Sequence, residues 1–154
     1  MFINNSTLSD NSASRDAGIS TGGRSDRMVI TNSVIANSLG GADCDNSPSS
    51  SGNNFTIDAA SIIEDGSCGA NRSGDPGLLP LADNGGVTQT HSLATDSIAI
   101  NSGDQSTCLA TDQRGLSRDS QCDVGAFEFG VDAANETSTF VIPLPNGKTV
   151  IFDL

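Results

Sequence analysis

The chain has 154 residues, a length that suits one domain, and its 35% of hydrophobic residues together with 17 glycines allows a core. A formal net charge of −12 disfavours nucleic acid and anionic membrane surfaces as partners, and no stretch is apolar for long enough to span a membrane. Strong helix formers are scarce, and Asn, Ser, Asp, Gly and Thr stand in their place. The composition therefore predicts an all-β protein.

The first predicted elements form a repeat. The stretch INNSTLSDNS, from Ile3 to Ser12, aligns with ITNSVIANS, from Ile30 to Ser38, at an offset of 27 residues. A weaker copy follows at NNFTIDAASII, residues 53–63, and each copy offers short strands separated by turn residues. Repeats of this length without helical patterning favour a right-handed parallel β-helix of few coils.

Coil stacking explains the residues that recur. Apolar side chains are predicted to point into the shaft, and they are Ile3, Leu8, Ile30, Val34 and Ile35. Asn5 and Asn32 occupy equal positions in successive coils and are predicted to form a hydrogen-bonded ladder. The alternative is that these asparagines belong to ordinary loops.

The four cysteines suit two disulfides. Cys44 and Cys68 lie 24 residues apart, close to one coil, so stacking would bring them within bridging distance. Cys108 and Cys122 would close a short loop and stabilise the fold by roughly 3 kcal/mol. A four-thiolate metal site is the competing interpretation, but it needs paired ligands that the spacing does not supply.

The stretch from Leu81 to Gly103 holds the only histidine, His91, and a DNGG turn with Gly85 and Gly86. Nothing in the sequence marks a catalytic partner for His91, so we expect a hydrogen-bonded structural histidine. If Gly86 has a positive φ, a β-branched residue there should destabilise the protein.

The next motif is DQRG, in which Asp112 and Arg114 are expected to fix the bridged loop as an ion pair or through backbone contacts, beside Gly115. Beyond Glu128 a polar linker, residues 130–139, leads to a predicted β-hairpin, residues 140–154, with a turn at Pro145, Asn146 and Gly147. The hairpin is either an assembly or sorting element or a strand pair that folds back over an apolar flank.

Two stretches carry a family resemblance. DPGLLPLADNGGVTQTHSLATDSIAINSG and TDQRGLSRDSQCDVGAFE, within Asp75 to Glu128, resemble the C-terminal part of bacterial surface β-helix proteins called choice-of-anchor Q domain proteins, often found with CSLREA domains. The chain departs from that pattern at Val87 and Ile98, where proline is usual, and at Asn101, where aspartate is usual.

The resemblance implies coils over residues 1–74, a terminal coil and disulfide-bridged cap over 75–129, and no assigned enzymatic activity, metal or cofactor. It also implies a longer exported precursor, truncated here at its N-terminus, with an extracellular or cell-surface location and an adhesin-like or structural role. Surface glycans or matrix are the expected partners, and unpaired strands of the first coil suggest self-association.

An enzyme is the alternative. Pectate-lyase-like β-helix proteins that cleave polysaccharides use clustered carboxylates, which Asp43, Asp45 and Asp65 could supply. Against this, the chain has no Trp and no Tyr to stack on sugar rings. The sequence therefore favours a protein that is not an enzyme.

Overall fold

The computed structural model describes residues 1–15, 17–21, 27–45, 55–132, 139–143 and 149–153, the last two ranges by their backbone. In these residues the regular elements are short strands and one 3-10 turn, η1 (Ser67–Gly69). The sheets before residue 130 are parallel. The prediction of an all-β protein is confirmed.

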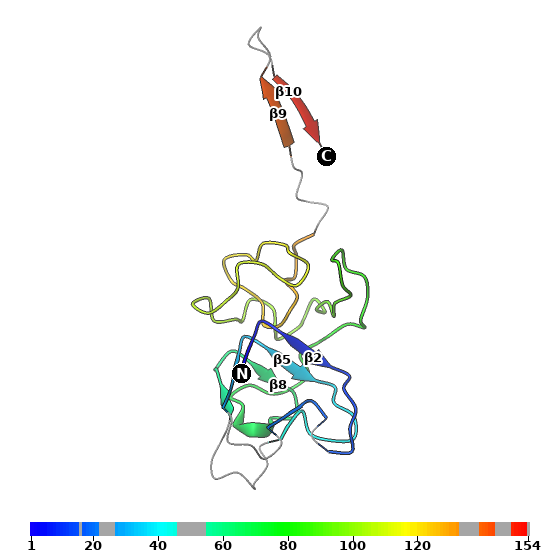
Figure 1. Cartoon of the computed structure of the whole chain (residues 1–154), viewed down its shortest axis with the longest axis vertical. Coiled ribbons are helices and arrows are strands. Elements are labelled where there is room, and N and C mark those ends of the chain that lie inside the picture. The colour runs from blue at the N-terminus through cyan, green and yellow to red at the C-terminus, as the bar shows by residue number, and fades with distance from the viewer. Residues whose placement is uncertain (16, 22–26, 46–54, 133–138, 144–148, 154) are drawn as a thin grey trace.

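Three parallel sheets are built from strands that return at a constant interval. The first contains β1 (Phe2–Asn4), β4 (Met28–Thr31) and β7 (Phe55–Ile57), and the second contains β2 (Thr7–Ser9), β5 (Val34–Ala36) and β8 (Ile62–Ile63). The third pairs β3 (Ile19–Ser20) with β6 (Cys44–Asp45). Figure 1 shows β2, β5 and β8 side by side. Each winding of the chain therefore contributes one strand to a sheet, which explains why the sequence repeats.

The corners between the sheets need a left-handed residue, and asparagine supplies it. Asn5 lies between β1 and β2 with φ of 41°, and Asn32 lies between β4 and β5 with φ of 45°. Asparagine tolerates this conformation better than other residues with a Cβ. The recurrence of Asn at these positions is therefore a backbone requirement.

A serine ladder follows these corners. The Ser6 N–H donates to Ser33 Oγ and the Ser33 N–H donates to Ser61 Oγ, both at 3.1 Å. Ser33 is fully buried, so these bonds satisfy donors that water does not reach. The ladder fixes the register of one winding on the next.

Two hydrophobic clusters lie on opposite faces of the second sheet, because successive side chains of a strand point in opposite directions. Ile35 and Ile63 pack inward with Ile3, Ile30, Cys44 and Phe55. Val34 and Ile62 pack outward against residues of the 75–129 segment. The prediction that Val34 points into the shaft beside Ile35 was therefore wrong, since adjacent strand residues do not share a face.

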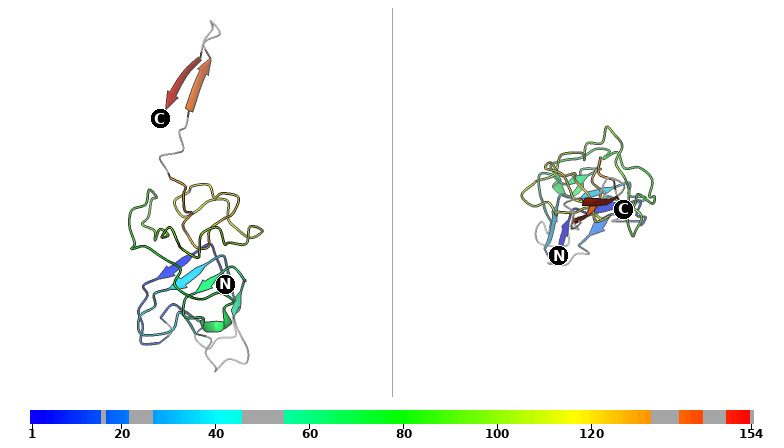
Figure 2. Two further views of the ribbon diagram at one scale, coloured as in Figure 1. Left: turned by 180° about the vertical axis from the view of Figure 1, so that it is seen from behind. Right: turned by 90° about the horizontal axis from the view of Figure 1, so that it is seen from above.

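The segment 75–129 covers the outward face of the second sheet, and Figures 1 and 2 show it lying against the windings along their flank. Its contribution to the shared cluster is Leu93, Ala99, Val124 and Phe127. At the contact Gly125 has φ of 102°, and a Cβ there would lie 2.8 Å from Thr7 Oγ1. A glycine is required because two backbones meet there with no room for a side chain.

A β-hairpin forms the last described element. β9 (Thr139–Pro143) and β10 (Thr149–Asp153) pair antiparallel with Phe140 opposite Phe152. In Figure 1 the hairpin stands apart from the rest of the molecule. The expected turn at 145–147 and most of the expected linker, residues 133–138, lie outside the described residues.

Candidate functional site

Both cysteine pairs are disulfides. Cys44 and Cys68 are joined with a Cα–Cα distance of 5.7 Å, and Cys108 and Cys122 with one of 6.6 Å. No cysteine of the chain is free. Two disulfides indicate an oxidising compartment. Among the described residues, no helix is long or apolar enough to cross a membrane.

The corner asparagines bind the 104–109 loop. Asn32 donates from Nδ2 to the Asp104 carbonyl at 3.1 Å and to Thr107 Oγ1 at 3.0 Å, and its Oδ1 accepts the Asp104 N–H at 2.7 Å. Asn5 Oδ1 accepts the Leu109 N–H at 3.0 Å. The predicted asparagine ladder is thus replaced by two parallel contacts to one loop, while serines stack between the windings.

A buried network of ion pairs holds the end of the 75–129 segment. Arg114 Nη2 lies 2.8 Å from Asp112 Oδ2, and Arg118 Nη1 lies 2.7 Å from Glu128 Oε2. The guanidinium of Arg114 also lies 3.8 Å from the centre of the Phe127 ring. Asp112 accepts further bonds from the backbone N–H groups of residues 114, 116 and 128. The pair therefore fixes the loop, as the sequence predicted for Asp112 and Arg114.

Two carboxyl groups of this network titrate abnormally. Burial raises the pKa of Asp123, and the N–H groups of Asn101 and Phe129 act in the opposite direction. Burial likewise raises the pKa of Glu128, with Arg118 and the Asp123 N–H opposing it. Both are acceptors of backbone N–H bonds, so their role in the structure is to hold neighbouring segments.

The three glycines singled out from the sequence behave differently. Gly85 has φ of 92° and Gly115 has φ of 85°, the left-handed region that favours glycine. Gly86 does not have a positive φ, so the reason given for its sensitivity is wrong. A Cβ at Gly86 would instead lie 3.1 Å from the Arg114 Cα, which makes close packing the constraint.

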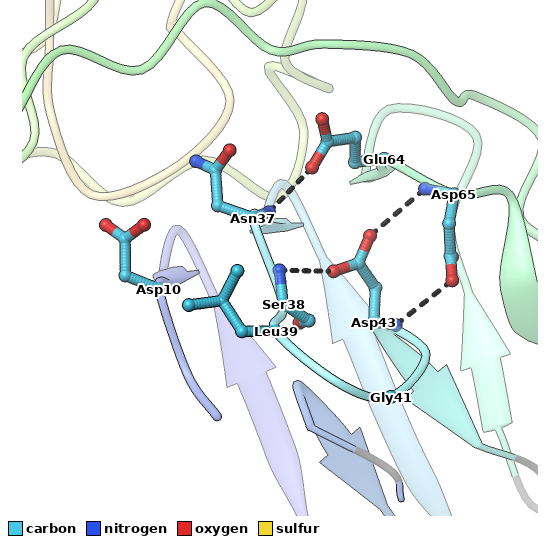
Figure 3. A pocket seen from close by; sticks show the side chains of 8 residues that line it. All are labelled: Asp10, Asn37, Ser38, Leu39, Gly41, Asp43, Glu64 and Asp65. Atoms are coloured by element: carbon cyan, nitrogen blue, oxygen red, sulfur yellow. Dashed lines mark hydrogen bonds between the residues drawn. The ribbon is translucent and has the colours of Figure 1, made fainter. Parts of the chain in front are cut away.

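An acidic cavity of about 380 Å³ lies beside β5 and β8, and Figure 3 shows its side chains. Asp43 and Asp65 face one another there, and each accepts the other's backbone N–H, at 3.0 and 3.1 Å. The Glu64 carboxylate accepts the Asn37 N–H at 2.6 Å. Three carboxylates of this cavity therefore bond to the backbone of neighbouring windings.

The structure gathers two of the three carboxylates that the enzyme alternative needs. Asp43 and Asp65 line the cavity, whereas Asp45 does not. Partial burial opposes the ionisation of Asp65, but bonds from the Ser67 hydroxyl and N–H and from the Asp43 N–H lower its pKa. Among the described residues, no group of three or more His, Cys, Asp or Glu side chains is arranged to hold a metal ion.

His91 lies at a neighbouring cavity of about 330 Å³, which shares Asp10 and Asn37 with the acidic one. Its Nδ1 lies 2.8 Å from the Leu79 carbonyl oxygen, and its Nε2 lies 3.7 Å from Asp10 Oδ2. The imidazole therefore joins the 75–129 segment to the first winding, which fits a structural histidine.

Sequence reasoning missed the serine ladder, the Arg118–Glu128 pair and the role of Asp123. The ladder had a signal, since Ser6 and Ser33 align in the repeat together with the asparagines. Arg118, Asp123 and Glu128 carry no such signal, because their contacts depend on how an irregular segment folds.

Comparison with known proteins gives no relative to reason from. No protein-family model, no curated protein and no solved structure matches this chain. The resemblance of Asp75 to Glu128 to choice-of-anchor Q domain proteins therefore remains a prediction, and the function is argued from the geometry.

Proposed function

We propose that the chain is a segment of an exported, cell-surface, right-handed parallel β-helix protein with an adhesin-like or structural role and no enzymatic activity. One observation carries this proposal: strands of three sheets return at a constant interval and pair in parallel, with Ile3 opposite Ile30 and Leu8 opposite Ile35. Windings that stack in this way make a rod, and a rod suits the display of a surface away from a cell.

The polar groups support a structural role. Asp43 and Asp65 bond to backbone N–H groups across windings, and Asp112 does so within the flanking segment. A carboxylate used in this way stabilises a loop and is less available as an acid or base. The disulfides agree with export, since such bonds persist in oxidising compartments.

The alternative is a polysaccharide lyase or glycoside hydrolase of the pectate-lyase-like type. One observation favours it, namely that Asp43, Glu64 and Asp65 line a single cavity together with Asp10. Paired carboxylates are the groups that such reactions use.

The two proposals separate in a combined assay of binding and depolymerisation. The protein is applied to a glycan array and incubated with polygalacturonate and other polysaccharides. We expect saturable binding to a glycan or matrix surface without new chain ends. Release of unsaturated or reducing ends, abolished by Asp65→Asn and kept by the exposed control Asp96→Asn, would establish the enzyme instead.

The handedness of the winding needs its own test, because parallel pairing alone does not fix it. An experimental structure should show right-handed windings in which β1, β4 and β7 follow one another. Left-handed windings would overturn this part of the proposal.

A further inference from the structure

A second cavity, of about 400 Å³, lies where the first winding meets the disulfide-bridged loop. Its floor comes from the corner Asn5, Ser6 and Thr7, and its walls come from the flanking segment. The wall residues are Leu109, Thr111, Asp112, Gln113, Arg118 and Ala126. This volume falls within the range of small-molecule sites and suits one or two sugar units.

The walls are held in place before any ligand arrives. Asn5 Oδ1 accepts the Leu109 N–H, and Thr7 Oγ1 accepts the Ala126 N–H, both at 3.0 Å. The side chain of Arg118 is 2% exposed and donates to Glu128 and to two backbone carbonyls. A preformed cavity binds without a cost of ordering its walls.

Several polar groups at the cavity are left without partners among the described residues. Nε of Arg118 is buried and makes no hydrogen bond. The Thr111 hydroxyl has no bond, and Gln113 uses its amide nitrogen, toward Thr88 and Gln89, but not its amide oxygen. The cavity therefore offers donors and acceptors in a small space.

The chemistry of these groups points to a neutral, polyhydroxylated ligand. The charge of Arg118 is balanced by Glu128, so an ionic ligand has no unpaired charge to meet. Leu109, half exposed, and Ala126 give the lining an apolar part. A pyranose ring presents both hydroxyl groups and a C–H face, which matches this lining.

We propose that this cavity is a saccharide-binding site for a neutral pyranose unit. The inference rests on the adhesin-like form of the proposed function and deepens it by placing the glycan contact between the first winding and the bridged loop. Thr111, Gln113 and Arg118 would bond the hydroxyls, and Leu109 would contact the ring face.

Titration of the ¹⁵N-labelled protein with methyl β-galactopyranoside, methyl α-glucopyranoside and N-acetylglucosamine, followed by NMR, tests the site. We expect saturable shifts at the amides of Leu109, Thr111 and Ala126 with at least one sugar. Thr111→Val and Leu109→Ser should each weaken binding about three- to tenfold, the loss of one contact. Thr95→Val, an exposed threonine outside the cavity, should leave the affinity unchanged.

Each outcome decides the matter. Absence of saturable shifts with all three sugars, or Thr111→Val and Leu109→Ser variants that bind as the wild type does, would overturn the site. Shifts confined to the surroundings of Asp10 and His91 would also overturn it, while leaving an adhesin with another contact. Depolymerisation by the wild-type protein would reject the proposed function whether or not this cavity binds.

Discussion

At the scale of single residues, most polar side chains of this protein act on the backbone. Asn32 combines two such roles, since it adopts a left-handed conformation at a corner and its amide makes three bonds to the 104–109 loop. It is also fully buried, so no water would replace a lost partner. Asn32 thus links the corner of the winding to the segment that covers it.

Asn32→Ala should destabilise the protein by about 2 to 4 kcal/mol, because it leaves buried groups unpaired and places a Cβ without compensation at positive φ. Asn32→Gly loses the same bonds but relieves the backbone, so it should cost about 1 kcal/mol less. Denaturant unfolding measures both. Equal losses for the two variants would show that the backbone conformation is not a constraint.

Asp65 predicts a pH dependence. Its pKa is lowered in the folded state, so its contribution to stability is present above the unfolded pKa near 4 and is lost as pH falls through the folded value. Asp65→Asn should therefore show a smaller loss of melting temperature between neutral pH and about pH 2 than the wild type. Asp96→Asn is the control, and a wild-type slope in Asp65→Asn would contradict the assignment.

Asp123 and Glu128 act in the opposite sense. Because burial raises their pKa, their ionisation costs stability as pH rises from the unfolded pKa near 4 through the folded value. The melting temperature of the wild type should therefore be higher at mildly acidic pH than these two groups would allow at neutral pH.

At the scale of elements, windings only two to four residues wide per strand are held by bonds between equal positions. Ser33 accepts the Ser6 N–H, donates to the Thr31 carbonyl and bonds through its own N–H to Ser61. Short strands supply few ladder bonds of their own, so side chains that repeat with the winding add what the strands lack.

Ser33→Ala should lower the free energy of unfolding by about 1 to 3 kcal/mol, since the Ser6 N–H and the Thr31 carbonyl lose a buried partner. Ser117→Ala, at an exposed position, serves as the control and should change it by less than about 0.5 kcal/mol. The measurement is equilibrium unfolding in urea. A Ser33→Ala variant as stable as the control would mean that water replaces the ladder.

At the scale of the whole molecule, the first winding leaves one side of each strand unpaired. β1 and β2 are outer strands of their sheets, and Phe2 on β1 is 83% exposed. Met1 and Asn5 direct backbone groups toward β4, so Phe2 directs its own away from the sheet. An open edge of this kind pairs with another chain, and we propose a second copy as the occupant.

Phe2→Pro should reduce this self-association, because it removes the outward N–H from the edge. Phe2→Leu keeps that N–H and is the matched control. Sedimentation velocity over a range of concentrations, repeated at higher salt to screen the net charge of −12, measures the effect. A wild-type protein that stays monomeric at every concentration and salt level would reject the proposal.

The sequence by itself determined the parts that depend on local chemistry and repetition. The offset of 27 residues placed Asn5 with Asn32 and Ser6 with Ser33, and the cysteine spacing indicated the bridge between Cys44 and Cys68. Hairpin residues were placed within one position of β9 and β10. These features are readable because each depends on near neighbours or on one repeated interval.

Only the tertiary structure decided where the irregular segment 75–129 lies and what its polar residues bind. It turned Val34 toward Leu93 and Val124, and it directed the corner asparagines to the 104–109 loop. It also paired Arg118 with Glu128. These contacts depend on which surfaces bury apolar area against one another, and a segment without periodic structure carries no pattern from which that choice can be read.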